Sequence, residues 1–153
     1  MADAVRARRA GDRGRFARAV DWRKIASAED ARCIFSQAVH LAGKSEGVFV
    51  IPLDAGHRTL SALVLVSLGS ESTAVVQPKD IFAEALKVGA DAVVIAHNHP
   101  SGDLTPSKAD IAFAAALREM CDRLGNIQLL GHIIIGSPDS ANGLGLVSIA
   151  EMK

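Results

Sequence analysis

The sequence predicts an α+β domain in which a mixed β-sheet is flanked by helices. Short apolar runs bounded by glycine, proline and polar residues are typical of strands. They alternate with longer segments whose apolar residues recur every three or four positions, as in amphipathic helices. The length of 153 residues suits one domain with a substantial core. The expected order of elements is α-β-β-β-α-β-α-β-β.

Three helices are expected, over residues 27–42, 78–88 and 107–124. Pro78 and Ser107 are typical of helix starts, and a glycine follows each helix, as is common at helix ends. The side chains expected to face the core are those of Ala31, Ile34, Phe35, Ala38, Val39, Leu41, Phe82, Leu86, Val88, Ile111, Phe113, Ala114, Leu117 and Met120.

The strands are expected from the apolar runs between the helices. Pro52 suggests that the first strand is an edge strand or carries a bulge, because proline cannot donate a hydrogen bond to a neighbouring strand. The expected strands are 46–54, a hairpin partner at 58–67, a short strand at 73–77, a buried run from 93 to 96 that leads into two histidines, 127–136 with an interruption at Gly131-His132, and 144–149.

Composition excludes two classes of protein. No apolar run approaches the ~18 residues of a membrane span, and the N-terminus has no apolar segment typical of a secretory signal. Cys33 and Cys121 fall in separate helices and are expected to be reduced core residues. These features predict a cytoplasmic protein without membrane contact, and they do not predict its oligomeric state.

The segment 92–110 carries the residues with the clearest chemistry. His97 and His99 are two apart on a strand, so their side chains share a face with Cα atoms ~6.6 Å apart, and both can reach one metal ion. Ser107 fits the N-cap of the next helix and Asp110 its third position, from which the carboxylate can fold back over the strand end. The alternative is a histidine pair beside an ordinary capping box.

Two imidazoles and one carboxylate suit catalytic zinc, which usually has three protein ligands and keeps a fourth position for water. The residual charge of such a site lowers the pKa of bound water toward ~7. The sequence therefore predicts Zn²⁺ held by His97, His99 and Asp110. A carboxylate outside this set would serve as general base.

The spacing His97-x-His99, seven residues, Ser107, two residues, Asp110 resembles the JAMM motif of the MPN metalloproteases, and the string HNHPSGDLTPS is similar to the bacterial RadC branch. The resemblance covers roughly residues 25–150 and implies the MPN fold, which is cytidine-deaminase-like, and a zinc-dependent hydrolase. It implies that Glu46, at the start of the first strand, is the catalytic base. It also implies that Ser107 donates a hydrogen bond to the oxyanion, unless its hydroxyl serves only as the helix cap.

Two features depart from the RadC pattern. RadC-like sequences usually place an acidic residue just before His132, where this chain has Gly131. His132 is expected either to support the site from behind a ligand or to be a core or edge histidine. RadC-like proteins normally also have a helical N-terminal module. Here residues 1–24 form a basic arm, expected to be disordered or partly helical, before a domain of residues 25–153.

Two classes of function fit these observations. The first is a zinc metallopeptidase or isopeptidase that acts on an unidentified peptide or protein. Ubiquitin is not expected, because the long insertion of JAMM deubiquitinases is absent. The second is a nucleic-acid-associated binding module, linked to DNA repair, with a bound metal. The complete motif favours the enzyme. A zinc nucleoside deaminase needs His-x-Glu and Pro-Cys-x-x-Cys, and this chain has neither.

The arm concentrates positive charge in a chain whose net charge is zero. Residues 1–24 hold eight basic and three acidic groups, a net charge of +5, so the remainder carries −5. One interpretation is weak contact with nucleic acid through phosphates. The other is a solvated tail, or one that pairs with the acidic body.

Deletion of residues 1–24 tests the arm. We expect the full chain to bind DNA or RNA weakly and without sequence preference, because the arm offers charge with few aromatic residues for stacking. The truncated chain should lose this binding and keep its zinc content. Fluorescence anisotropy across a salt series measures the binding. Unchanged low-salt binding by the truncated chain would contradict the role of the arm.

Overall fold

A computed structural model describes residues 24–42, 45–61, 63–68, 76–136 and 146–150. The basic arm, apart from Lys24, therefore lies outside the described residues. The described helices and strands, in chain order, are α1 (Ala28–Ala42), β1 (Gly47–Leu53), β2 (Val64–Leu68), α2 (Pro78–Lys87), β3 (Ala92–His99), α3 (Lys108–Leu124), β4 (Gln128–Gly136) and β5 (Leu146–Ala150).

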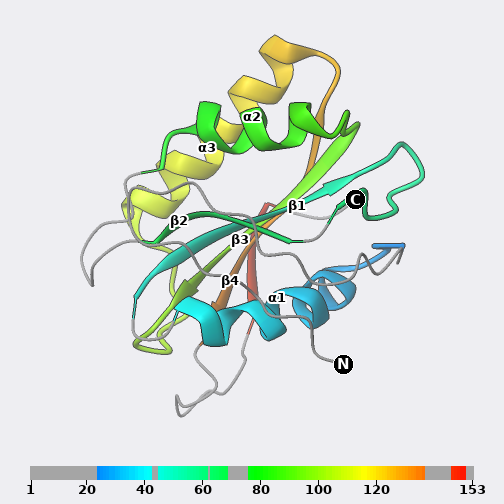
Figure 1. Cartoon of the computed structure of the whole chain (residues 1–153). Helices are drawn as coiled ribbons and strands as arrows, with labels where there is room; N and C mark the ends of the chain where they lie inside the picture. Colours follow the sequence, from blue (N-terminus) through cyan, green and yellow to red (C-terminus); the bar gives the residue numbers. More distant parts are fainter. Residues whose placement is uncertain (1–23, 43–44, 62, 69–75, 137–145, 151–153) are drawn as a thin grey trace.

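The strands form one mixed sheet in the order β2-β1-β3-β4-β5. Strands β3 and β4 are parallel, and the other three neighbouring pairs are antiparallel. Helix α1 covers one face of the sheet and α2 and α3 cover the other, which gives three layers (Figure 1). The predicted α+β class with a mixed sheet and flanking helices is confirmed.

Side chains of the central strands alternate between two core clusters, as the period of two in a strand requires. On β3, Val94 and Ala96 pack in the cluster under α1, while Val93 and Ile95 pack in the cluster under α2 and α3. These four residues are fully buried. The central strand is therefore rigidly held from both faces up to the point where its histidines begin.

The start and stop signals of the helices act as predicted. Pro78 is the first residue of α2, and Ser107 is the N-cap of α3 with a reciprocal capping box to Asp110. Gly89 and Gly125 follow α2 and α3 with φ of 67° and 69°, a left-handed conformation that glycine adopts without strain.

Pro52 was expected to mark an edge strand or a bulge, but β1 is an internal strand. Pro52 lies beyond the last β1–β2 pair, Val50 with Val64, and its carbonyl accepts a hydrogen bond from Leu60 N at 3.0 Å. The nitrogen of Pro52 points to the same side as its carbonyl, where β2 no longer runs beside β1. The N–H that proline lacks would therefore not have bonded to a neighbouring strand. The bulge of β1 lies elsewhere, between Val48 and Phe49.

The second strand of the hairpin is shorter than the predicted 58–67. Arg58 and Thr59 form only isolated bridges, and β2 begins at Val64. The predicted strand 73–77 falls mainly on residues outside the description, and Val76 and Gln77 are not in a strand. Strand β4 runs through Gly131-His132 without the predicted interruption. Its pairing with β3 is irregular just before Gly131, but this irregularity is a bulge, which does not end the strand.

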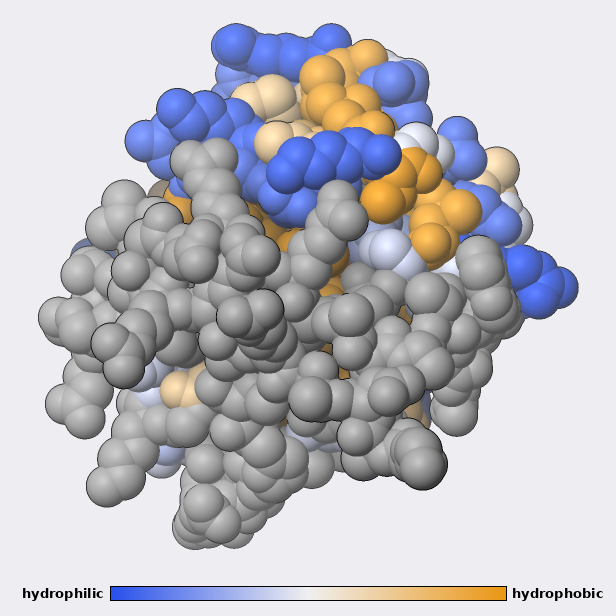
Figure 2. All heavy atoms as spheres, viewed as in Figure 1, coloured by the Kyte–Doolittle hydropathy of each residue, from blue (hydrophilic) through white to orange (hydrophobic). Residues whose placement is uncertain are grey.

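Three residues that were expected in the core are exposed. Leu86 and Ile111 are 48% and 55% exposed, and Cys33 is exposed as well. At 100° per residue, Leu86 and Ile111 lie about 90° from the centres of the buried faces of α2 and α3, and Cys33 lies almost opposite that of α1. Apolar and hydrophilic side chains therefore mix over α2 and α3 (Figure 2). Cys121 is buried, as expected.

Among the described residues, no helix is long and apolar enough to cross a bilayer.

Helix α2 offers a matched test of the packing. Ile81 is fully buried, whereas Leu86 on the same helix is 48% exposed. We expect Ile81→Ala to lower the free energy of unfolding by about 2–5 kcal/mol through lost burial and a residual cavity. Leu86→Ala should cost less than about 1 kcal/mol. Urea denaturation measures both, and equal losses would contradict the orientation of α2.

Candidate metal centre

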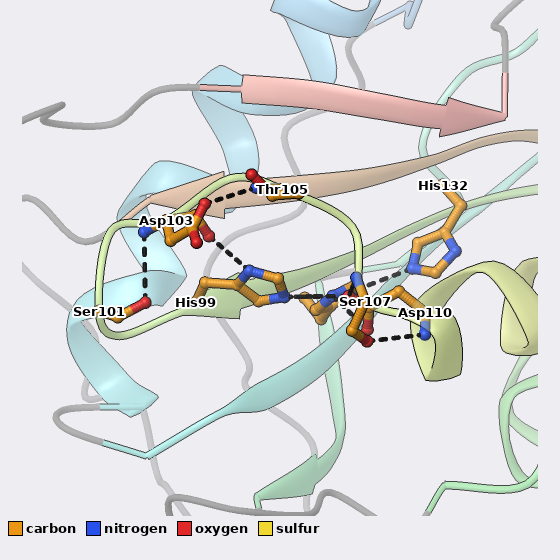
Figure 3. A network of polar contacts seen from close by, with 8 residues as sticks. His99, Ser101, Asp103, Thr105, Ser107, Asp110 and His132 are labelled. Carbon is orange, nitrogen blue, oxygen red and sulfur yellow. Dashed lines mark hydrogen bonds and ion pairs between the residues drawn. The ribbon is translucent and has the colours of Figure 1, made fainter.

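Three separate segments meet at the carboxyl end of β3. His97 and His99 are its last residues on the face under α3, Asp110 lies in the first turn of α3, and Glu46 immediately precedes β1. Each of these four side chains offers a ligand atom, and the four atoms lie within 4.8 Å of one another. Figure 3 shows His99, Asp110 and His132 converging beside the start of α3.

Three of the four donors form a small triangle. His97 Nε2 lies 3.0 Å from His99 Nε2, Asp110 Oδ1 lies 3.1 Å from His97 Nε2, and Asp110 Oδ2 lies 3.3 Å from His99 Nε2. Ligands of a tetrahedral zinc ion, each at about 2.0–2.1 Å, lie about 3.3 Å apart. The triangle therefore has the size that a single zinc ion requires, and the residues fit the metal.

His99 presents its Nε2 lone pair to this triangle. Its Nδ1 lies 2.6 Å from the carbonyl oxygen of Asp103, as the dashed line in Figure 3 shows. A carbonyl oxygen only accepts hydrogen bonds, so Nδ1 carries the proton and the neutral ring is left with its lone pair on Nε2. This arrangement, in which the second nitrogen is held by a carbonyl, is common for histidines that bind metals.

His97 is held in the same way by another histidine. Its Nδ1 lies 2.9 Å from Nε2 of His132, which is fully buried on β4. Burial and the neighbouring His97 lower the pKa of His132 to about 3, so the ring is neutral and can accept at Nε2. His132 then carries its proton on Nδ1, which has no hydrogen-bond partner among the described residues. Of the two interpretations of His132, the structure favours support from behind a ligand.

Gly131 does not account for this unpartnered nitrogen. It lies opposite Val94, which packs under α1, whereas His132 lies opposite Ile95 on the other face of the sheet. A side chain at position 131 would therefore point away from His132. Among the described residues, His132 binds His97 without the second anchor that metal-site histidines commonly have, and an orphaned buried donor costs about 1–3 kcal/mol.

Asp110 serves the helix and the site together. Its Oδ2 accepts a hydrogen bond from Ser107 N at 2.7 Å, while both imidazoles face the same carboxylate. Burial alone would raise the pKa of Asp110, but the adjacent His97 imidazole and the hydrogen bond from the Ser107 backbone N–H outweigh it and hold the pKa well below its usual range. The carboxylate is therefore ionised and available as a ligand at all physiological pH values.

Ser107 caps α3 through its oxygen. The hydroxyl oxygen accepts a hydrogen bond from Asp110 N at 3.0 Å. An accepted bond occupies a lone pair and leaves the hydroxyl proton for another acceptor. The cap and the predicted donation to an oxyanion are thus compatible and do not exclude each other. Asp103, in the loop between the ligands, has its pKa lowered by hydrogen bonds from Thr105.

The sequence motifs did not identify Asn98 as a site residue, yet both polar atoms of its side chain are hydrogen-bonded. It lies between the two histidines, is 1% exposed and points to the opposite face of β3. Its Oδ1 accepts a hydrogen bond from Gly47 N at 2.7 Å, and its Nδ2 donates to the Ser45 carbonyl at 3.0 Å. One signal in the sequence could have identified Asn98. It is a polar residue at a strand position that faces the apolar core, as the positions two and four residues before it do.

Comparisons with known proteins identify the family of the chain. Residues 25–152 match the family described as the RadC-like JAB domain. A UPF0758 protein of Carboxydothermus hydrogenoformans is 50% identical over 93 residues, which are 61% of this chain and 40% of that protein. A UPF0758 protein of Staphylococcus carnosus is 40% identical over 114 residues, which are 74% of this chain and 49% of the relative.

A third relative gives the same picture. A UPF0758 protein of Finegoldia magna is 41% identical over 95 residues, or 62% of this chain and 42% of that protein. The chain thus spans less than half the length of these relatives. The family match, in contrast, covers nearly the whole chain and includes each residue of the candidate site. The chain belongs to the RadC-like JAB domain family.

Proposed function

We propose that this chain is a zinc-dependent hydrolase of peptide or isopeptide bonds. The observation that supports it most is the cluster itself. Three donors have zinc-ligand spacing, and a fourth donor, the Glu46 carboxylate, lies beside them. Such a set matches a catalytic site, which leaves one position open, better than a closed structural site. The JAMM-like spacing of the motif supports the same reaction class.

His97, His99 and Asp110 would hold the ion. When bound, zinc acts as a Lewis acid that polarises the scissile carbonyl and makes a water molecule acidic enough to lose its proton near pH 7. The role of the three residues is to keep two neutral imidazoles and one carboxylate aimed at one point. The hydrogen bonds of His99 to Asp103 and of His97 to His132 support this aim.

Glu46 would be the general base. It approaches from the segment before β1, whereas the ligands come from β3 and α3, so it can contact a water molecule without displacing a ligand. Its carboxylate would accept the proton of the attacking water and pass it to the leaving amine. The Ser107 hydroxyl would donate a hydrogen bond to the oxyanion that forms at the carbonyl carbon.

A metal-binding module without catalysis is the second candidate. It could use the same three ligands and close the site with Glu46 as a fourth. The JAMM-like spacing of the motif favours the hydrolase, and the variant Glu46→Gln separates the two candidates, because loss of a fourth ligand would weaken zinc binding.

The metal is tested first. We expect purified protein to carry about one zinc per chain and the double variant His97→Ala/His99→Ala to carry none. Imidazoles bind zinc only when deprotonated, so the zinc affinity should fall as the solution becomes more acidic. Elemental analysis after dialysis at several pH values measures both effects.

The matched control is His57→Asn. His57 lies outside the cluster and has a positive φ of 61°, a conformation that asparagine tolerates. This variant should retain wild-type zinc content. Stoichiometric zinc in the double variant would show that the metal binds elsewhere.

The base is tested with Glu46→Gln, which keeps the shape of the side chain but cannot accept the proton. We expect wild-type zinc content and a rate lower by roughly 10²–10⁴, the usual contribution of a general base. An unbiased peptide library, analysed by mass spectrometry, provides the substrate and the rate.

Asp103→Asn is the comparison variant, because Asp103 is the carboxylate in the loop between His99 and Asp110. It should retain its zinc and most of the rate. Wild-type turnover by Glu46→Gln together with loss of turnover in Asp103→Asn would transfer the role of base to Asp103.

A further inference from the structure

A buried amide links the metal ligands to the segment that carries Glu46. Asn98 lies between His97 and His99, and its side chain points away from them toward the face of the sheet under α1. It bonds to Ser45 and Gly47, the two residues that flank Glu46, although these lie 53 and 51 positions away in the sequence.

The partners fix the orientation of the amide. The Gly47 N–H can only donate and the Ser45 carbonyl can only accept, so the oxygen of Asn98 faces Gly47 and its nitrogen faces Ser45. An amide without partners would be costly at this site, because Asn98 is 1% exposed. The neighbours of Asn98 on the same face of β3, Val94 and Ala96, are apolar. The two hydrogen bonds are therefore what makes asparagine favourable at this otherwise apolar position.

The backbone at Glu46 needs this support. Strand β1 begins only at Gly47, and its pairing with β3 begins at Val48 opposite His97, so no ladder between these strands holds Glu46. Gly47 also has little space for a side chain, because a Cβ placed there would lie 3.0 Å from Cζ of Phe49. Asn98 thus holds the backbone on both sides of Glu46.

We propose that Asn98 is a positioning residue that holds the Glu46 carboxylate at the metal site through its hydrogen bonds to Ser45 and Gly47. This rests on the function proposed above, in which Glu46 is the base. Asn98 itself touches neither the ligand atoms nor the water. In the segment 97–99, the two histidines would then bind the metal, and Asn98 between them would position the base.

The first measurement needs neither metal nor substrate. In Asn98→Ala, the Gly47 amide should exchange its hydrogen about tenfold faster or more relative to the other β1 amides, because its acceptor is gone. Val94→Ala is the matched control, since it removes buried atoms from the same face of β3 without touching Ser45 or Gly47. It should destabilise the protein but leave this ratio unchanged. An unchanged ratio in Asn98→Ala would overturn the proposal.

The second measurement uses acetohydroxamic acid as a probe of the zinc-loaded protein. This acid binds metal centres as its anion, and the proton that it gives up needs a neighbouring acceptor, which Glu46 supplies. Calorimetry should show about tenfold weaker binding or more in Glu46→Gln, because a hydrogen bond to a charged group is lost. Asn98→Ala should weaken binding about three- to tenfold, and the double variant should be no weaker than Glu46→Gln alone. Zinc affinity should be unchanged in Asn98→Ala.

The outcomes separate the two proposals. A loss in Glu46→Gln with wild-type binding in Asn98→Ala and Val94→Ala would overturn the role of Asn98 and leave the base intact. Wild-type binding in Glu46→Gln would overturn the base, and the role of Asn98 with it. If Asn98→Ala does not fold, Asn98→Ser replaces it. This variant keeps a small polar side chain that is too short to bond to both Ser45 and Gly47, so a weakening that is again absent in the Glu46→Gln background supports the proposal, and no weakening overturns it.

Discussion

The alternation of side chains along β3 is the constraint on which the site depends. Because β3 is central and both of its faces are packed, its residues cannot slip without moving apolar side chains out of two cores. The same alternation sends His97 and His99 to one face and Asn98 to the other. The packing of β3 in the two cores therefore also fixes the direction in which the two histidine side chains point.

Helix α3 supplies the second requirement, through one carboxylate that serves two purposes. Asp110 closes the capping box with Ser107 and faces both imidazoles from the same position. A capping interaction contributes about 0.5–2 kcal/mol to helix stability. The carboxylate is thus held in place by the helix start, and the start of α3 is set by a group that also faces His97 and His99.

Local patterns predicted most of the fold, and long-range contacts account for what they missed. Start signals such as Ser107 act within one helical turn, so the sequence alone locates them. The exposure of Leu86 and Ile111 depends on which face of each helix meets the sheet, and this cannot be derived from apolar periodicity when a residue lies at the flank. Cys33 lies almost opposite the buried face of α1, so its exposure contradicts only the usual burial of cysteine. The two bonds of Asn98 join residues more than 50 positions apart, so no local rule could have identified them.

The two-sided use of β3 also limits how this domain can be re-engineered. An extra residue inserted before His97 would turn both imidazoles toward α1 and the Asn98 amide toward α3. Two extra residues would restore the facing but lengthen the strand by about 6.6 Å, which carries the histidines past the start of α3. Libraries that vary chain length therefore belong in the connections between elements, and within β3 only substitutions of equal length preserve the site.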